Sequence, residues 1–220
     1  MTRPVPERSA ITGIVLAGGL GRRMGADGGN VDKGLRTFRG RPMVAHVIER
    51  LTPQVGTLSI NANRQPDAWR AFGVPVFPDV VEGFAGPLAG LHAAMLHART
   101  PWIATAPCDS PFLPADLVGR LARAVAQAGA QVAVARTGDQ PHPVFALVDR
   151  SLQAHLEAFL VSGRRRIDAW YAPLRVVEVA FDDEAAFRNI NTAEELERWA
   201  REPDPGMPDP SPAAAQDPPR

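Results

Sequence analysis

The sequence has little of what marks secreted, membrane or nucleic-acid-binding proteins. Its 220 residues contain one cysteine, Cys108, so no internal disulfide can form and nothing favours an oxidising compartment. Lys plus Arg and Asp plus Glu number 24 each, so no net charge draws the chain to nucleic acid or to an acidic membrane. No apolar run approaches the ~18 residues of a membrane span, and the N-terminus has no apolar signal region. These absences predict a cytoplasmic protein without nucleic-acid or membrane partners.

The composition is that of a globular protein with enough length to bury a core. Hydrophobic residues make up 45% of the chain and charged residues 22%. Residues 1–10 are expected to be an N-terminal extension, and residues 11–200 a single domain. Residues 201–220 are rich in proline and have few side chains to bury, so we expect a disordered tail.

Short apolar segments alternate along the chain with segments of helical period. The expected strands are Thr12–Leu16, Thr57–Asn61, Val74–Phe77, Trp102–Ala106, Gln131–Ala135, Val144–Val148 and Arg175–Val179. The expected helices are Met43–Thr52, Pro66–Phe72, Pro87–Ala98, Pro114–Ala128, Ser151–Leu160 and one beginning at Thr192. This alternation predicts an α/β fold with a mainly parallel sheet covered by helices on both faces. Ligands bind beyond the carboxyl ends of such strands, so the polar residues there are expected to converge on one crevice.

A glycine-rich segment, residues 12–34 (TGIVLAGGLGRRMGADGGNVDKG), follows the first expected strand. Glycines let backbone N–H groups approach an anion, and the pair Arg22-Arg23 and Lys33 could neutralise it. A P-loop is excluded because Lys33 is followed by Gly34 rather than by Ser or Thr. A dinucleotide fingerprint is excluded because Met24 stands where its third glycine would be. The segment therefore predicts a nucleotide site of a third kind.

The pattern LAGGxGRRMG…DKG in this segment resembles the signature of nucleoside-triphosphate transferases. Further matches follow in the same order and narrow the resemblance to the molybdenum cofactor guanylyltransferases. They are Asn61-Ala62-Asn63-Arg64, Pro78-Asp79, Gly86-Pro87-Leu88-Ala89-Gly90, Pro107-Cys108-Asp109-Ser110-Pro111, His142-Pro143 and Asn189-Ile190-Asn191-Thr192. The resemblance covers about residues 11–200 and implies a Rossmann-like three-layer fold of the nucleotide-diphosphosugar transferase type. It also implies transfer of GMP from GTP to molybdopterin, which gives molybdopterin guanine dinucleotide and pyrophosphate.

The resemblance also implies roles for individual residues. Lys33, Arg23 and Asp109 are the expected catalytic residues, and Asp109 is the expected ligand of Mg²⁺, which prefers one or two carboxylates plus phosphate oxygens. The expected nucleotide-binding set is Leu16, Ala17, Gly18, Gly19, Arg22, Lys33, Asn61, Asp79 and Asp109. From the residues alone, Asp109 could equally cap the helix expected near Pro114, and the cations could form a solvated surface. Asn61 and Asp79 could simply shape turns.

Four further features have a functional and a structural interpretation. By resemblance, His142 in a polar loop, the run Arg164-Arg165-Arg166, and the pair Asn189 and Asn191 would meet the pterin. Alternatively, His142 is structural, the arginines are a solvated patch and the asparagines turn the chain. The segment Gly86–Gly90 could offer a helix N-terminus to an anion or mark close packing. Cys108 is expected to be a small buried residue without a chemical role.

The expected substrates are GTP and molybdopterin, with cofactor-biosynthesis proteins and client molybdoenzymes as candidates for further partners. One alternative is a cytidylyltransferase or another nucleotidyltransferase that acts on a different phosphorylated acceptor. Backbone groups of residues 16–19 could read the base, so side chains do not separate guanine from cytosine. A second alternative is a nucleotide-binding module without catalysis. The segment at residues 26–31 is longer than is usual in the family, which costs little closure entropy.

Overall fold

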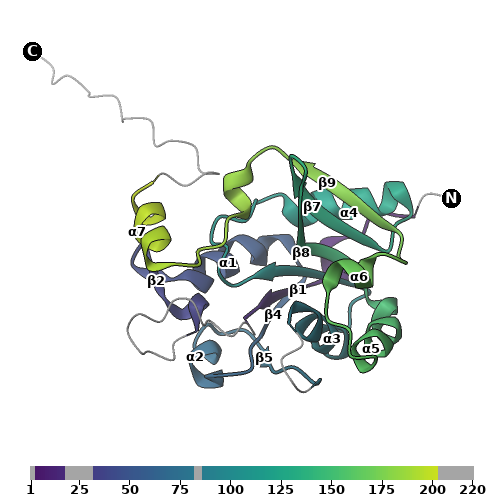
Figure 1. Cartoon of the computed structure of the whole chain (residues 1–220), viewed down its shortest axis with the longest axis horizontal. Coiled ribbons are helices and arrows are strands. Elements are labelled where there is room, and N and C mark those ends of the chain that lie inside the picture. Colours follow the sequence, from purple (N-terminus) through teal and green to yellow (C-terminus); the bar gives the residue numbers. More distant parts are fainter. Residues whose placement is uncertain (1–2, 18–31, 82–85, 203–220) are drawn as a thin grey trace, which may run out of the picture.

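The computed structural model describes residues 3–17, 32–81 and 86–202. A seven-stranded sheet with the order β5-β4-β1-β6-β8-β7-β9 lies between two layers of helices (Figure 1). Its strands are β1 (Ile11–Leu16), β4 (Thr57–Asn61), β5 (Val76–Phe77), β6 (Trp102–Pro107), β7 (Val132–Thr137), β8 (Gln140–Asp149) and β9 (Val176–Phe181). A separate pair is formed by β2 (Thr37–Phe38) and β3 (Arg41–Pro42). The predicted three-layer α/β fold is confirmed.

The sheet is mostly parallel, with one strand reversed. Strands β5, β4, β1 and β6 run parallel, as do β7 and β9, whereas β8 is antiparallel to both β6 and β7. A tight turn joins β7 to β8, where Thr137 pairs with Gln140 and Gly138 has a φ of +51° that favours glycine. The prediction that His142 lies in a polar loop is wrong, because β8 begins at Gln140 and includes it.

The helices are α1 (Met43–Leu51), α2 (Pro66–Arg70), α3 (Pro87–His97), α4 (Leu117–Ala128), α5 (Gln153–Val161), α6 (Ile167–Tyr171) and α7 (Ala193–Arg201). Helices α1 and α4 cover one face of the sheet, and α3 and α5 cover the other (Figure 1). In α1, Met43, Val44, Val47 and Leu51 are buried at helical spacing. Helix α4 begins at Leu117, three residues later than predicted. In the described part of the chain, no helix is long and apolar enough to cross a bilayer.

Helix α7 begins with the capping box that its sequence predicts. The Thr192 hydroxyl accepts a hydrogen bond from the Glu195 N–H at 3.1 Å. The Glu195 carboxylate accepts from the N–H groups of Asn191 and Thr192 at 2.7 and 3.2 Å. Leu196 and Trp199 then pack against a small buried cluster that includes residues of β2 and α1, and α7 lies beside β2 in Figure 1. These contacts fix the segment 189–192 that precedes α7.

Candidate active site

The carboxyl ends of neighbouring parallel strands bring several predicted site residues to one edge of the sheet. Leu16 ends β1 and Asn61 ends the adjacent β4. The Ala17 N–H donates to the Asn61 carbonyl at 2.8 Å, and the Cys108 N–H, just after β6, donates to the Leu16 carbonyl at 3.1 Å. The expectation that these positions share one edge is confirmed.

Lys33 and Asp109 form an ion pair at this edge. The Lys33 Nζ lies 3.6 Å from the Asp109 Oδ2, with side chains 21% and 13% exposed. The same Nζ donates to the Asn191 Oδ1 at 2.7 Å. Burial raises the pKa of the Asp109 carboxyl above its ordinary value, and the charge of Lys33 opposes that rise. One neighbouring cation therefore compensates this buried carboxylate only in part, and a further cation would stabilise its charged form.

The segment before α7 is tied to the loop that carries Asp109. The Ile190 N–H donates to the Asp109 carbonyl at 2.9 Å. The Ser110 hydroxyl donates to the Asn189 Oδ1 at 2.5 Å. Asn189 and Asn191, predicted only from resemblance, therefore lie beside the Lys33–Asp109 pair, although they are far away in sequence.

Asn61 and Asp79 meet in a network of amides and one carboxylate. The Asp79 carboxylate accepts from the Asn61 Nδ2 at 3.0 Å and from the Asn63 Nδ2 at 2.8 Å. The Asp79 N–H donates to the Asn63 Oδ1 at 2.7 Å. Asn61 is 1% exposed and also donates to the Phe77 carbonyl at 3.4 Å. The buried amide of Asn61 thus orients the Asp79 carboxylate at the end of β5.

The segment Gly86–Gly90 begins helix α3 and packs closely against this network. Gly86 precedes the helix with φ and ψ of +71° and −159°, which side chains rarely adopt, and Pro87 follows at the first helical position. A Cβ on Gly90 would lie 2.3 Å from the Asn61 Oδ1 and 2.7 Å from the Leu16 Cδ2. The close-packing interpretation is confirmed at Gly90.

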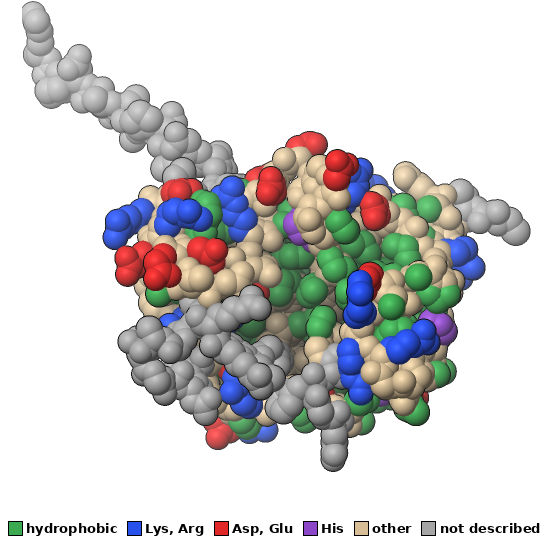
Figure 2. Space-filling view, viewed as in Figure 1, with side chains coloured by type: hydrophobic (Ala, Val, Ile, Leu, Met, Phe, Trp, Pro, Cys, Tyr) green, Lys and Arg blue, Asp and Glu red, His purple; other side chains and the backbone are tan. Residues whose placement is uncertain are grey.

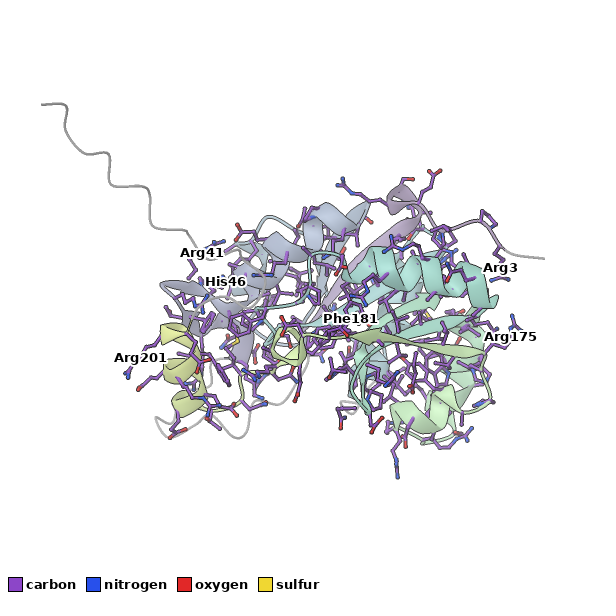
Figure 3. All side chains as sticks on the ribbon, turned by 90° about the horizontal axis from the view of Figure 1, so that it is seen from above. Arg3, Arg41, His46, Arg175, Phe181 and Arg201 are labelled. Atoms are coloured by element: carbon purple, nitrogen blue, oxygen red, sulfur yellow. The ribbon has the colours of Figure 1, made fainter. Side chains whose placement is uncertain are left out.

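His142 belongs to an aromatic cluster on the second half of the sheet. Its Nε2 is hydrogen-bonded to the Thr137 hydroxyl at 2.8 Å, and its ring stacks on Phe187 with centroids 4.7 Å apart. Burial lowers the pKa of His142, which the charge of Glu184 opposes. Phe181, at the end of β9, packs edge-on against Phe187 and lies in the middle of the molecule in Figure 3, whereas Arg175 lies at the opposite end of that strand.

The arginine run lies between α5 and α6 and contacts these helices. The Arg164 guanidinium lies over the Phe159 ring at 4.3 Å, and Arg165 donates to the Leu160 carbonyl. Arg166 pairs with Asp168 at 2.5 Å. On the face shown in Figure 2, hydrophobic side chains gather in a hollow at the centre, with charged side chains around its rim. The contacts of these arginines fit a solvated surface, and the expected contact with the pterin stays a prediction.

Several predicted positions lie outside the described residues. They are Gly18, Gly19, Arg22, Arg23, the segment 26–31 and the tail from residue 203. Among the residues that are described, no group of three or more His, Cys, Asp or Glu side chains could hold a metal ion.

Two contacts near Lys33 went unrecognised in the sequence. Asp32 is buried, pairs with Arg64 at 2.5 Å, and accepts from the Trp69 Nε1 at 3.3 Å. Asp32 and Arg64 both belong to the motifs that carry the family resemblance, and this membership was the available signal that each residue matters. Spacing along the chain gives no sign that those two motifs touch each other.

Comparisons with known proteins agree with the fold. Residues 13–177 match the MobA-like NTP transferase domain. The chain is 53% identical over 194 residues to a molybdenum cofactor guanylyltransferase of Cupriavidus necator, covering 86% of this chain and 96% of that protein. It is 51% identical over 201 residues to a protein of the same name from Ralstonia nicotianae, covering 87% and 97%.

Solved structures share the same architecture. The crystal structure of molybdopterin-guanine dinucleotide biosynthesis protein A from Archaeoglobus fulgidus is 27% identical, with a TM-score of 0.69 over 85% of this chain and 95% of that one. A nucleotidyl transferase from Methanothermobacter thermautotroptrophicus, 19% identical, shares the fold with a TM-score of 0.69 over 86% and 95%. The chain belongs to the molybdenum cofactor guanylyltransferases, a group of nucleotidyltransferases with the MobA-like NTP transferase domain.

Proposed function

We propose that this protein transfers GMP from GTP to molybdopterin, forming molybdopterin guanine dinucleotide and pyrophosphate. The observation that carries the proposal is the Lys33–Asp109 pair, with 3.6 Å between Nζ and Oδ2 at the carboxyl edge of the parallel strands. Names of relatives about half identical over most of the chain support the choice of substrates. Residues 11–200 would form one nucleotidyltransferase domain.

The nucleotide is assigned to the ends of β1, β4 and β5. Leu16, Ala17, Gly18 and Gly19 would face it with their backbone, and Asn61 and Asp79 would bind it through the amide–carboxylate network. Lys33 would bind the triphosphate, together with Arg22 and Arg23. Positive charge placed there stabilises the charge that develops on the departing pyrophosphate.

Asp109 is the residue that would hold a divalent cation, Mg²⁺ in our proposal. The fit rests on the position of its carboxylate, 13% exposed at the carboxyl edge of the strands, and on its oxygen donors, which suit a hard cation. When bound, such an ion neutralises charge on phosphate oxygens. Asp109 and Lys33 together would orient the phosphates, since the ammonium lies within reach of both the carboxylate and the Asn191 amide.

In this reaction, the protein needs to form no covalent bond to either substrate. The terminal phosphate of molybdopterin is already an anionic nucleophile, so no side chain needs to remove a proton. Its oxygen forms a bond to the α-phosphorus of GTP, and the bond to the β-phosphate oxygen breaks with its electron pair leaving on pyrophosphate. Positioning and charge neutralisation supply the rate enhancement. On the acceptor side, we assign His142, Asn189 and Asn191.

The test is pyrophosphate release from purified protein with molybdopterin and Mg²⁺, comparing GTP, CTP and ATP. Release with GTP alone is expected. Release with CTP instead would retain the mechanism and replace the guanylyl assignment by the cytidylyl alternative. Absence of release with any nucleotide, given active molybdopterin, would favour a different acceptor or a binding module and contradict the proposal.

Two substitutions test the assigned roles. Asp109→Ala is expected to abolish metal-dependent turnover, and Lys33→Ala to weaken GTP use by about 1–3 kcal/mol, as for charge-assisted hydrogen bonds. Asp67→Ala is the matched control, because the Asp67 side chain is 93% exposed and pairs only with nearby Arg70 on α2 among its described contacts. Near-normal turnover of Asp109→Ala with Mg²⁺ would contradict the metal assignment.

A further inference from the structure

A buried carboxylate stands directly before Lys33 and takes no part in the reaction proposed above. The Asp32 side chain is 4% exposed, and its Oδ1 lies 2.5 Å from the Arg64 Nη2. Its Oδ2 accepts from the Trp69 Nε1 at 3.3 Å. Asp32 precedes the 3₁₀ turn Lys33–Leu35, yet its side chain does not cap that turn. Both carboxylate oxygens are engaged by other parts of the chain.

The partners of Asp32 are themselves held in place. Arg64 follows the end of β4, and Trp69 is fully buried on α2. A buried carboxylate is stable when its charge is paired and its oxygens accept hydrogen bonds. The pair with Arg64 and the bond from Trp69 meet both needs, so the backbone at Asp32 is anchored to the sheet and to α2.

A second anchor lies on the other side of Lys33. A Cβ on Gly34 would lie 2.9 Å from the Cys108 Cβ and 2.9 Å from the Trp69 Cη2. The backbone of Gly34 therefore lies directly against these two side chains. Cys108 is a buried free cysteine whose side chain packs against this backbone. Lys33 is thus fixed from both neighbouring positions.

We infer that Asp32 is a positioning residue for Lys33. Its contacts with Arg64 and Trp69 hold the turn so that the Lys33 ammonium lies beside Asp109 and Asn191 before a nucleotide binds. This inference rests on the proposed role of Lys33 in binding the triphosphate. It places the determinant of that role in a residue to which the proposed reaction assigns no substrate contact.

Asp32→Asn is the sharpest perturbation. The amide keeps the size of the carboxylate and can still accept from Trp69, but it removes the charge that faces Arg64. Loss of a partner that orients a ligand-binding group typically costs 10- to 100-fold. We expect kcat/KM for GTP to fall by about 10- to 100-fold, with a raised KM for GTP. The control is Asp67→Asn, the same change at a 93% exposed aspartate on α2, and it should leave kcat/KM unchanged.

The deciding measurement repeats Asp32→Asn in a Lys33→Ala background. A residue that acts through Lys33 has little left to position there, so we expect a further loss of less than about 3-fold. If Asp32→Asn causes the same fold loss in both backgrounds, its role is independent of Lys33 and the inference is overturned.

A binding experiment keeps the inference testable without turnover, and also if Asp32→Asn fails to fold. Trp69→Phe removes the hydrogen bond to Asp32, and its shorter side chain also gives up the contact of the Trp69 Cη2 with Gly34, so both anchors of Lys33 are loosened. We expect the Kd for GTP to rise by at least the roughly 2- to 10-fold typical of one hydrogen bond, and the Kd for guanosine, which has no phosphate, to stay constant. Equal weakening of both ligands would overturn the inference. Wild-type protein that binds GTP but releases no pyrophosphate would instead contradict the proposed function alone.

Discussion

Replacing Gly90 by alanine is expected to destabilise the protein, although alanine is the better helix former. Gly90 lies in α3, and a Cβ there would meet the Asn61 Oδ1 at 2.3 Å, the Leu16 Cδ2 at 2.7 Å and the Asn61 Cγ at 3.0 Å. Contacts under 3.0 Å require something to move. Asn61 is 1% exposed and its amide donates to Asp79 at 3.0 Å, so its movement breaks a hydrogen bond to a carboxylate.

The expected magnitude follows from three opposing contributions. Overpacking a core costs about 1–3 kcal/mol, and the hydrogen bond to a charged group contributes about 1.5–3 kcal/mol. The higher helix propensity of alanine returns about 1 kcal/mol. The free energy of unfolding of Gly90→Ala should therefore fall by about 1.5–5 kcal/mol, and loss of the Asn61–Asp79 hydrogen bond should also impair GTP use.

Urea unfolding with Gly119→Ala as the matched control measures this effect. Gly119 is exposed on α4, and a Cβ there would meet only the Arg123 Nη1, at an unstrained 3.8 Å. The same substitution should stabilise the protein by about 0.5–1 kcal/mol at this position. The urea concentration at the midpoint of unfolding should fall for Gly90→Ala and rise for Gly119→Ala, with similar m values. If Gly90→Ala were as stable as the wild type, the packing argument would be refuted.

Two other perturbations test the described contacts. Burial lowers the pKa of both His92 and His142, so the unfolded chain takes up protons near pH ~6.5 that the folded state does not yet bind. This contribution to the free energy of unfolding is fully present above that pH and is lost as the pH falls. Replacing both histidines by glutamine should therefore flatten the decline in the free energy of unfolding between about pH 7.5 and 5.5. An unchanged slope of that free energy against pH would exclude the histidines as the source of the decline. Thr192→Ala removes the acceptor for the Glu195 N–H and should lower the free energy of unfolding, measured in urea, by about 1 kcal/mol. An unchanged free energy of unfolding would show that the capping box contributes nothing measurable.

Local patterns predicted most elements, but they did not predict the full length of β8. The segment Val144–Val148 was correctly expected to be a strand, but β8 extends back to Gln140 through Pro141 and Pro143. Prolines argue against a strand because their backbone nitrogen carries no hydrogen to donate to a neighbouring strand. Here the pairing of β8 with β6 begins only at Ala146, so neither proline removes a bond to β6. Whether a proline is tolerated here depends on which residues of β8 pair with β6, and local residue propensity does not predict that pairing.

The site was predictable at positions where a motif carries the chemistry. Lys33 and Asp109 were recognised separately, and the structure places them 3.6 Å apart. The Asp32–Arg64 pair was not recognised, because its members are 32 residues apart and their spacing along the chain does not indicate a contact. Contacts of this kind arise when strand ends meet, so they follow from the order of strands in the sheet rather than from spacing along the chain.

The contact between Lys33 and Asn191 also has a consequence for when the protein becomes active during its synthesis. The two residues are 158 positions apart. At roughly 5–20 residues per second, a ribosome needs about 8–30 s after Lys33 to reach Asn191. Until then the Lys33 ammonium has no amide partner at that position, and the Ser110 hydroxyl lacks Asn189. The nascent chain can form its first strands early, but the contact of Lys33 with Asn191 is completed only after residue 191 has been added.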